Sequence, residues 1–312
     1  MTTSPKRTIL ITGCSDGGLG AALAIAFHNA GWRVLATARN PSKLAQVTAA
    51  GLETILLDTQ SDASIAAAVD QTAKLTGGSL DVLLNNAGAG YSMPLMDLDL
   101  AKARNLFDLN VFSLIAVTRA FLPLLLTSTW RQSHGAKAGE RGIVVNNTSG
   151  VALPAGTTPF SGAYNASKAA AASVTETMRL ELAPFGVRAI NLVTGGVESL
   201  FHENFEDGVR LPDDSMFARI SDKVRDKVEW AIRGAGGNEG KMGQGEYAAG
   251  VVREVGARNP PHWIWRGKWV GMVRLFNLLP VGFGDSLVKG IMGLDLVEAE
   301  IKALERQGKK VV

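Results

Sequence analysis

The sequence predicts an α/β fold with a doubly wound parallel sheet, Rossmann-like, and helices on both faces. Three observations predict it. Short β-branched runs alternate with longer helical segments, which is typical of right-handed βαβ units. The strand-like runs are nearly all apolar, as in strands that are covered on both faces. A glycine-rich segment directly follows the first strand.

Predicted strands and helices alternate regularly up to residue 193. The predicted strands are 8–12, 33–38, 53–57, 80–85, 142–147 and 187–193. The predicted helices are 19–31, 42–50, 61–75, 98–126 and 161–183. The polar stretch 128–141 is longer than the usual connection of ~2–6 residues, so we interpret it as a surface insertion.

Beyond residue 193 the alternation stops. Residues 200–242 mix charged, glycine-rich and helical pieces, and such a segment beyond the carboxyl ends of the strands is expected to form a lid over a ligand. A helix is predicted at 246–256 and a last strand at 262–266. We therefore expect a single Rossmann-type domain over 1–266, including the lid, and an apolar and basic C-terminal extension over 267–312.

Composition excludes several classes of protein. With 46% hydrophobic and 20% charged residues, the 312-residue chain is neither disordered nor a coiled coil. A formal net charge of +3 is too small to bind nucleic acid by electrostatics. The only cysteine, Cys14, excludes an intramolecular disulfide and agrees with a reducing compartment, and the polar start predicts no signal peptide.

The glycine-rich segment is the first candidate site. Glycines there permit a tight turn and close approach of the backbone to a pyrophosphate, and the helix N-terminus offers free N–H groups to the anion. An ordinary strand-to-helix turn is the alternative, but the position in a βαβ unit favours a dinucleotide. The candidate cofactor-binding residues are Gly13, Ser15, Gly18, Leu19 and Gly20.

Two charged residues follow the next strands. Arg39 stands where an enzyme that prefers NAD usually carries an acid for the ribose hydroxyls. A guanidinium suits a 2′-phosphate better, so Arg39 favours NADPH and NADP⁺, with a solvated loop arginine as the alternative. Asp58 could accept a hydrogen bond from the adenine amino group, or it could cap a turn.

Tyr164 and Lys168 are the candidates for proton chemistry. Four positions apart on a predicted helix, they share one face. A nearby ammonium stabilises a phenolate and so moves the phenol pKa from ~10 towards the working range. A Tyr and a Lys at this spacing also occur by chance on surface helices, so the neighbouring motifs decide the interpretation.

Those motifs occur in a fixed order: the glycine turn, Asn85-Asn86-Ala87-Gly88, Asn110, Ser149, and then Tyr164 with Lys168. Together, over about 7–199, they resemble the short-chain dehydrogenase/reductase family. The resemblance implies that Tyr164 is the general acid towards a carbonyl oxygen and that Ser149 donates a hydrogen bond to that oxygen. It implies that Lys168 tunes the phenol pKa and binds the nicotinamide ribose, and that Asn110 holds a water for proton relay.

The resemblance also implies cofactor contacts for Asn86, Gly88, Val197 and Ser199, although a structural role for Asn86 and Gly88 has equal weight. Three departures from the family pattern stand out. The glycine turn has one residue more, so Gly17 or Gly18 could take the middle role. The Ser149-to-Tyr164 interval is two residues longer, which predicts a longer loop at 155–158, and Thr194-Gly195-Gly196 replaces the usual Pro-Gly.

The extension has two interpretations. Trp263, Trp265 and Trp269 are interleaved with Arg266, Lys268 and Arg274, and aromatic residues with flanking cations are typical of an interfacial membrane segment. Alternatively, the extension covers the substrate cleft or forms a subunit interface. The form of this tail is similar to the fungal 1-acyl-dihydroxyacetone-phosphate reductase branch and its relatives in secondary-metabolite pathways.

These observations lead to one main hypothesis and two alternatives. We expect an NADPH-dependent enzyme that reduces a hydrophobic ketone, such as an acyl-dihydroxyacetone-phosphate-like lipid, to a secondary alcohol. A ketoreductase or dehydrogenase that tailors a secondary metabolite or sterol is the first alternative, and a non-catalytic dinucleotide-binding scaffold is the remote one. We expect no metal, a homo-oligomer, and a cytoplasmic location, with peripheral binding to endoplasmic reticulum or lipid droplets as a further option.

Overall fold

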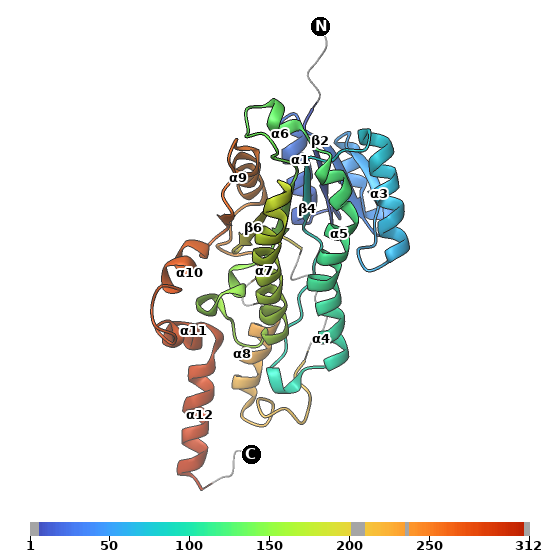
Figure 1. The fold of residues 1–312 in the computed structure, drawn as a ribbon. Coiled ribbons are helices and arrows are strands. Elements are labelled where there is room, and N and C mark those ends of the chain that lie inside the picture. The colour runs from blue at the N-terminus through green and yellow to red at the C-terminus, as the bar shows by residue number, and fades with distance from the viewer. Residues whose placement is uncertain (1–5, 201–209, 235–236, 309–312) are drawn as a thin grey trace.

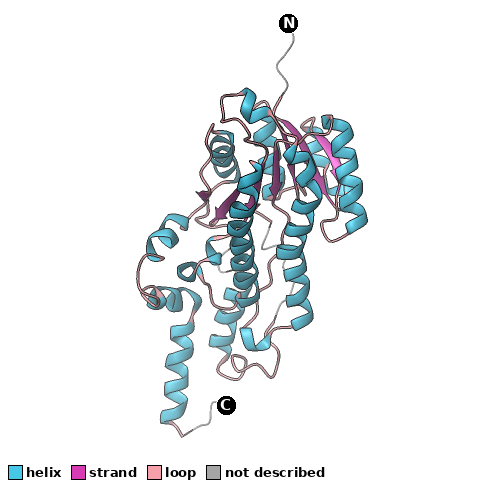
Figure 2. Cartoon of the chain, in the orientation of Figure 1, coloured by secondary structure: helices cyan, strands magenta, loops and turns pink. Residues whose placement is uncertain are grey.

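The structure is a computed structural model, and it describes residues 6–200, 210–234 and 237–308. Its centre is a seven-stranded sheet in the order β3-β2-β1-β4-β5-β6-β7, and every pair of neighbouring strands is parallel. Figure 2 shows the strands, in magenta, lying among the helices. The predicted doubly wound sheet is confirmed. The strands are β1 Thr8–Ile11, β2 Arg33–Ala38, β3 Glu53–Leu56, β4 Val82–Asn85, β5 Ile143–Asn147, β6 Arg188–Thr194 and β7 Trp263–Arg266.

Helices cover both faces of this sheet. On one face, α1 (Leu19–Asn29), α2 (Ala45–Ala49) and α9 (Gln244–Gly256) bury an apolar cluster that includes Phe27 and Tyr247. On the other face, α3 (Asp62–Thr76) and α5 (Ser113–Leu126) bury a second cluster around Phe121, and α7 (Gly162–Leu182) packs on β6. Because both faces are covered, the inner strands β1, β2, β4, β5 and β6 are almost wholly buried, as their apolar sequences predict, whereas the edge strands β3 and β7 are partly exposed.

The predicted helix 98–126 is interrupted. It consists of α4 (Leu100–Phe107), a π-turn at Asp108–Phe112 and α5, and the N–H of Ser113 donates to the carbonyl oxygen of Asp108, five residues earlier. By length and composition, Leu100–Leu126 could cross a membrane, but half of its most apolar window is buried inside the protein. The packing of α5 against α3 and β4 makes it a core helix.

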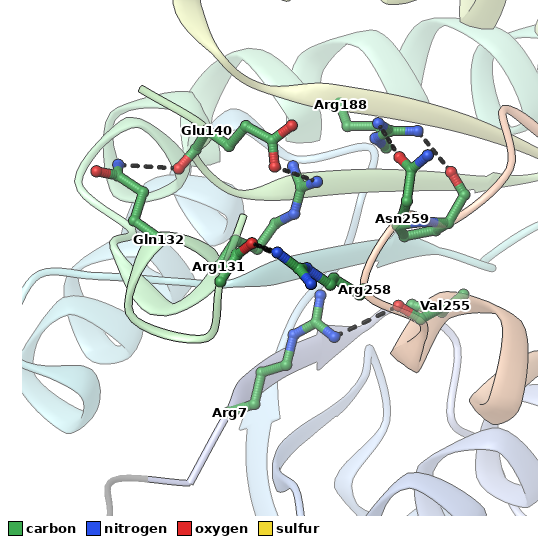
Figure 3. Close-up of polar contacts among 10 residues, drawn as sticks. Arg7, Arg131, Gln132, Glu140, Arg188, Val255, Arg258 and Asn259 are labelled. Carbon is green, nitrogen blue, oxygen red and sulfur yellow. Dashed lines mark hydrogen bonds and ion pairs between the residues drawn. The ribbon is translucent and has the colours of Figure 1, made fainter. Parts of the chain in front are cut away.

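The insertion at 128–141 is more than a surface loop, so that interpretation was wrong in part. Arg131, on the short helix α6 (Trp130–Ser133), is only 4% exposed, and its guanidinium lies 2.7 Å from the carboxylate of Glu140. The Arg7 guanidinium packs between the rings of Trp32 and Trp130, at 4.3 and 4.5 Å from their centroids. Arg188 and Arg258 complete a basic cluster beside this insertion (Figure 3).

The lid and the extension share a third apolar cluster. The lid helix α8 (Asp222–Ile232) contributes Val224 and Val228, and the extension contributes Met292 and Val297. The extension folds as α10 (Val270–Phe276), α11 (Asp285–Met292) and α12 (Leu294–Arg306), of which α11 and α12 contact α8 (Figure 1). The predicted lid, 200–242, includes 201–209 and 235–236, which lie outside the described residues.

Candidate active site

The glycine turn is shaped by close approaches of the backbone. Gly13 has φ +73°, and a Cβ there would lie 2.8 Å from Cα of Ala87. A Cβ on Gly20 would lie 2.2 Å from the carbonyl oxygen of Gly13. Both contacts are closer than any side chain allows, so these two positions require glycine.

The structure gives different tasks to Gly17 and Gly18. Gly17 has φ +70° and makes the turn, whereas Gly18 has φ −86° and caps α1 without a side-chain hydrogen bond. The first N–H groups of α1, at Leu19 and Gly20, are therefore not capped by a side chain. An uncapped helix start behind a glycine-rich turn fits the phosphates of a dinucleotide, and Ser15 lies in the same turn.

The residues after β2 and β3 have different surroundings. Arg39 is exposed, and within the described part of the chain no hydrogen bond or ion pair holds its guanidinium. The carboxylate of Asp58 accepts a 3.1 Å hydrogen bond from the N–H of Gln60, so it caps a turn, as the alternative interpretation has it. Arg39 therefore remains available for an anion at the adenosine end of the site.

The Asn86 side chain hydrogen-bonds the glycine turn to the middle of the sheet. Its side-chain Nδ2 donates to the carbonyl oxygens of Thr12, at 3.0 Å, and Gly13, at 3.2 Å. Its Oδ1 accepts a 2.9 Å hydrogen bond from Nδ2 of Asn147. These contacts describe a structural role for Asn86. Gly88 lies deeper, where a Cβ would be 3.0 Å from Oδ1 of Asn110 and 3.5 Å from Nζ of Lys168.

Ser149 and Tyr164 meet at the carboxyl edge of the sheet. Ser149 follows β5, Tyr164 lies in the first turn of α7, and the two side chains lie close enough for Ser149 to affect the pKa of the phenol. Burial raises the pKa of Tyr164 to about 12, and the neighbouring Ser149 side chain acts in the opposite direction. The neighbouring Thr148 instead hydrogen-bonds to the buried side chain of Asn191, so its hydroxyl is turned into the core.

Lys168 is buried one turn further along α7. Its Nζ donates a 3.0 Å hydrogen bond to the carbonyl oxygen of Asn147 and lies 6.0 Å from the centroid of the Tyr164 ring. Burial lowers the pKa of Lys168 to about 8. The expected lowering of the Tyr164 pKa by this ammonium is not found, because burial dominates the titration of both groups.

Asn110 joins two elements from within the π-turn. Its Nδ2 donates to the carbonyl oxygen of Ala89 and to Oγ of Ser167, each at 3.0 Å, and its Oδ1 accepts from the N–H of Ala89 at 3.0 Å. The amide thus connects the loop after β4 to α7, next to Lys168. This arrangement positions the site, while the water implied by the family resemblance stays a prediction.

The segment after β6 lies against the extension. A Cβ on Gly196 would lie 2.5 Å from the Trp269 ring, so this glycine makes room for the indole. Val197 is buried and forms a bridge with Met242, and the N–H of Ser199 donates to Oδ1 of Asn238 at 3.1 Å. The structure thus brings Val197 and Ser199 to the lid side of the site.

Sequence reasoning missed Asn147. Its carbonyl oxygen accepts a hydrogen bond from Nζ of Lys168, and its Oδ1 accepts a 2.5 Å hydrogen bond from the hydroxyl of Thr194. Its Nδ2 donates a hydrogen bond to Oδ1 of Asn86. A signal was present, since two adjacent asparagines end an otherwise apolar strand. Buried asparagines are costly unless their amides are hydrogen-bonded, so the pair predicts a polar network.

Comparison with known proteins agrees with this geometry. The model of the short chain dehydrogenase family matches residues 7–209. The chain belongs to the short-chain dehydrogenase/reductase family. It is therefore an oxidoreductase of a family that binds NAD(P) and acts on CH–OH groups of small molecules. The predicted family membership is confirmed.

Two curated relatives and one solved structure illustrate the likeness. A short-chain dehydrogenase/reductase of Pestalotiopsis microspora is 41% identical over 96% of this chain and 98% of its own. The NADPH-dependent 1-acyldihydroxyacetone phosphate reductase of Schizosaccharomyces pombe is 40% identical over 62% of this chain and 61% of its own. A short-chain dehydrogenase from Streptomyces avermitilis has a TM-score of 0.67 at 25% identity, covering 98% of both chains.

Proposed function

We propose that this protein is an NADPH-dependent reductase that converts a hydrophobic ketone to a secondary alcohol. The observation that carries the proposal is the position of the Ser149 side chain beside the Tyr164 phenol, with Lys168 one helical turn away. Two hydroxyls that converge on one point can both serve a carbonyl oxygen placed there. This convergence argues against a non-catalytic scaffold, which needs neither hydroxyl.

The chain's own groups supply the proton side of the reaction. The bound nicotinamide cofactor supplies the hydride for the carbonyl carbon. Tyr164, whose raised pKa keeps the phenol protonated at neutral pH, donates its proton to the carbonyl oxygen as the O–H bond of the alcohol forms. Ser149 donates a hydrogen bond to the same oxygen, and the Lys168 ammonium stabilises the phenolate left behind. Asn110 holds α7 and the loop at Ala89 in register for this step.

Support for NADPH comes from the adenosine end of the site. Arg39 follows β2, is exposed, and provides a cation where a 2′-phosphate would lie. The relative from Schizosaccharomyces pombe is NADPH-dependent by name. No carboxylate follows β2 directly to repel the phosphate.

Two substrate classes are proposed, in order of preference. An acyl-dihydroxyacetone-phosphate-like lipid comes first, supported by the similarity to the Schizosaccharomyces pombe reductase. A polycyclic secondary metabolite or sterol ketone comes second. The Pestalotiopsis microspora relative, which matches 96% of this chain, carries only the family name and therefore favours neither substrate class. We also propose a cytoplasmic homo-oligomer, in which the exposed Leu100 and Phe112 would pack against a second copy.

The test is oxidation of NADPH over a panel of carbonyl compounds. The panel contains an acyl-dihydroxyacetone phosphate, a steroid ketone, a polycyclic ketone and 2-alkanones of several lengths. The proposal is supported if Tyr164→Phe abolishes turnover while NADPH binding, measured by fluorescence titration, is retained. NADPH oxidation that is equal in the Tyr164→Phe variant would remove the acid role.

A further inference from the structure

An open cavity of about 560 Å³ lies between the C-terminal extension and the loop that joins β5 to α7. Its volume falls within the ~300–1,000 Å³ of small-molecule sites. The loop contributes Pro154, Ala155 and Pro159, and the extension contributes Leu279, Phe283 and Val288. Both walls are therefore mainly apolar.

The loop that lines this cavity is close in sequence to the reacting groups, since it begins after Ser149 and ends before Tyr164. The loop is folded tightly upon itself, because a Cβ on Gly156 would lie only 2.0 Å from the carbonyl oxygen of Gly150. A Cβ on Gly150 would lie 3.9 Å from the side chains of Val270 and Val273, so α10 packs directly on the loop. One short segment thus connects the Ser149 hydroxyl with the apolar wall.

Backbone strain occurs next to the loop wall and at the start of α10, in the two segments that carry the walls. Among the described residues, Phe160 at φ +64° and Trp269 at φ +62° are the two non-glycine residues in the left-handed region. Phe160 directly follows the loop wall and packs edge-on against Phe217 of the lid segment, 5.4 Å between ring centroids. Trp269 begins α10 and lies against Gly196. Strain of this kind is retained where the surroundings impose it, often at ligand sites.

We propose that this cavity binds a long, uncharged aliphatic chain of the ketone substrate, an inference that rests on the proposed reductase function. Charges at the cavity disfavour an acidic ligand. The Lys289 ammonium is already paired with the carboxylate of Glu298, 2.6 Å away, and Asp285 adds a further carboxylate to the lining. A neutral chain matches the remaining apolar surface, and the carbonyl group would then extend along the loop towards Ser149.

The dependence of turnover on the length of the substrate's alkyl chain tests this proposal. For 2-alkanones from 2-butanone to 2-dodecanone, kcat/KM is expected to rise up to about fourfold for each methylene that the cavity buries. Ala155→Trp fills the cavity and flattens this dependence, so that kcat/KM with 2-dodecanone falls towards kcat/KM with 2-butanone. Leu278→Trp is the matched control, because Leu278 neighbours the lining residue Leu279 but is 81% exposed and outside the cavity. A flat series in the wild-type protein would overturn the proposal.

A binding measurement tests the cavity without any catalysis. The neutral probe N-phenyl-1-naphthylamine is expected to fluoresce on binding and to be displaced by 1-dodecanol but not by 1-butanol. Binding is lost in Ala155→Trp and retained in Leu278→Trp. Should Ala155→Trp fail to fold by circular dichroism, Leu279→Asp against Leu278→Asp gives the same comparison. Equal probe binding in the cavity variant and its control would contradict the proposal that the cavity binds an aliphatic chain. Probe binding as expected with no carbonyl reduced would overturn the reductase function alone.

Discussion

The Lys168 ammonium lies 6.0 Å from the centroid of the Tyr164 ring and donates its hydrogen bond to the carbonyl oxygen of Asn147. That oxygen is neutral, so burial lowers the pKa of Lys168 to about 8 without an opposing carboxylate. The charge that stabilises the Tyr164 phenolate is therefore present below pH 8 and lost as the pH rises through this value.

Reduction should accordingly slow in alkaline solution. We expect kcat/KM for NADPH-dependent reduction to fall as pH rises above about 8, approaching tenfold per pH unit, as for loss of one proton. Tyr164 does not limit this range, since its pKa is raised to about 12. In Lys168→Arg the guanidinium cannot be deprotonated in this range. The fall of kcat/KM near pH 8 should therefore disappear, even if the substitution changes the absolute rate. The measurement is kcat/KM from about pH 6 to about pH 10, and an unchanged descending limb in Lys168→Arg would refute the assignment.

Cofactor choice depends on the exposed Arg39. Arg39→Asp replaces a charge-assisted contact by repulsion of the 2′-phosphate, so KM for NADPH should rise at least about tenfold, while KM for NADH changes much less. Steady-state kinetics with both cofactors measure the ratio. Arg306→Asp, at the far end of α12, is the control for net charge. An equal loss with NADH and NADPH would show that Arg39 does not contact the phosphate.

Local sequence patterns were enough to predict the sheet and the order of the site residues. Apolar runs flanked by glycine turns fix β1, β4 and β5, and the residues that follow these strands meet at one edge because parallel strands end there. Distant contacts were not predictable in the same way. The burial of Arg131 depends on Glu140 and on the packing of Arg7 against Trp130, neither of which has a periodic signal.

The site shows the same division between local and distant effects. The spacing of Tyr164 and Lys168 predicts that they share a helix face, and they do. The direction of the Tyr164 pKa shift depends on how much protein covers the phenol, so spacing alone gave the wrong direction. The cavity joins residues near 155 with residues near 280, and no local pattern relates segments so far apart.

The Arg131 and Glu140 pair should be important for stability. Burial lowers the pKa of Arg131, the Glu140 carboxylate opposes this, and Arg188 lies close enough to lower it further. Glu140→Ala leaves a guanidinium that is 4% exposed without its carboxylate and should cost about 3 kcal/mol of unfolding free energy. Urea denaturation measures the loss. Glu298→Ala, which breaks an exposed pair with Lys289, should leave the urea midpoint unchanged, and equal effects of both substitutions would contradict the argument.

The outer side of the extension should bind a lipid surface. Six large apolar side chains of the extension that lie outside the cavity are at least 40% exposed: Trp269, Met272, Leu275, Leu278, Leu287 and Ile291. Soluble monomers rarely expose so much apolar surface in one stretch, and Lys268 and Arg274 add cations that favour anionic lipid.

We therefore expect the full chain to float with phosphatidylcholine vesicles that contain phosphatidylserine, and to float less at high salt, because screening weakens the attraction of the cations. Leu275→Ser with Leu278→Ser should reduce the bound fraction more than tenfold. The matched control is Leu180→Ser with Phe185→Ser, because these two side chains near the C-terminal end of α7 are 63% and 64% exposed but lie outside the extension. Equal flotation of both double variants, or none by the wild-type chain, would exclude membrane binding by the extension and leave the cleft-covering role of α10, which already packs on the loop after Ser149.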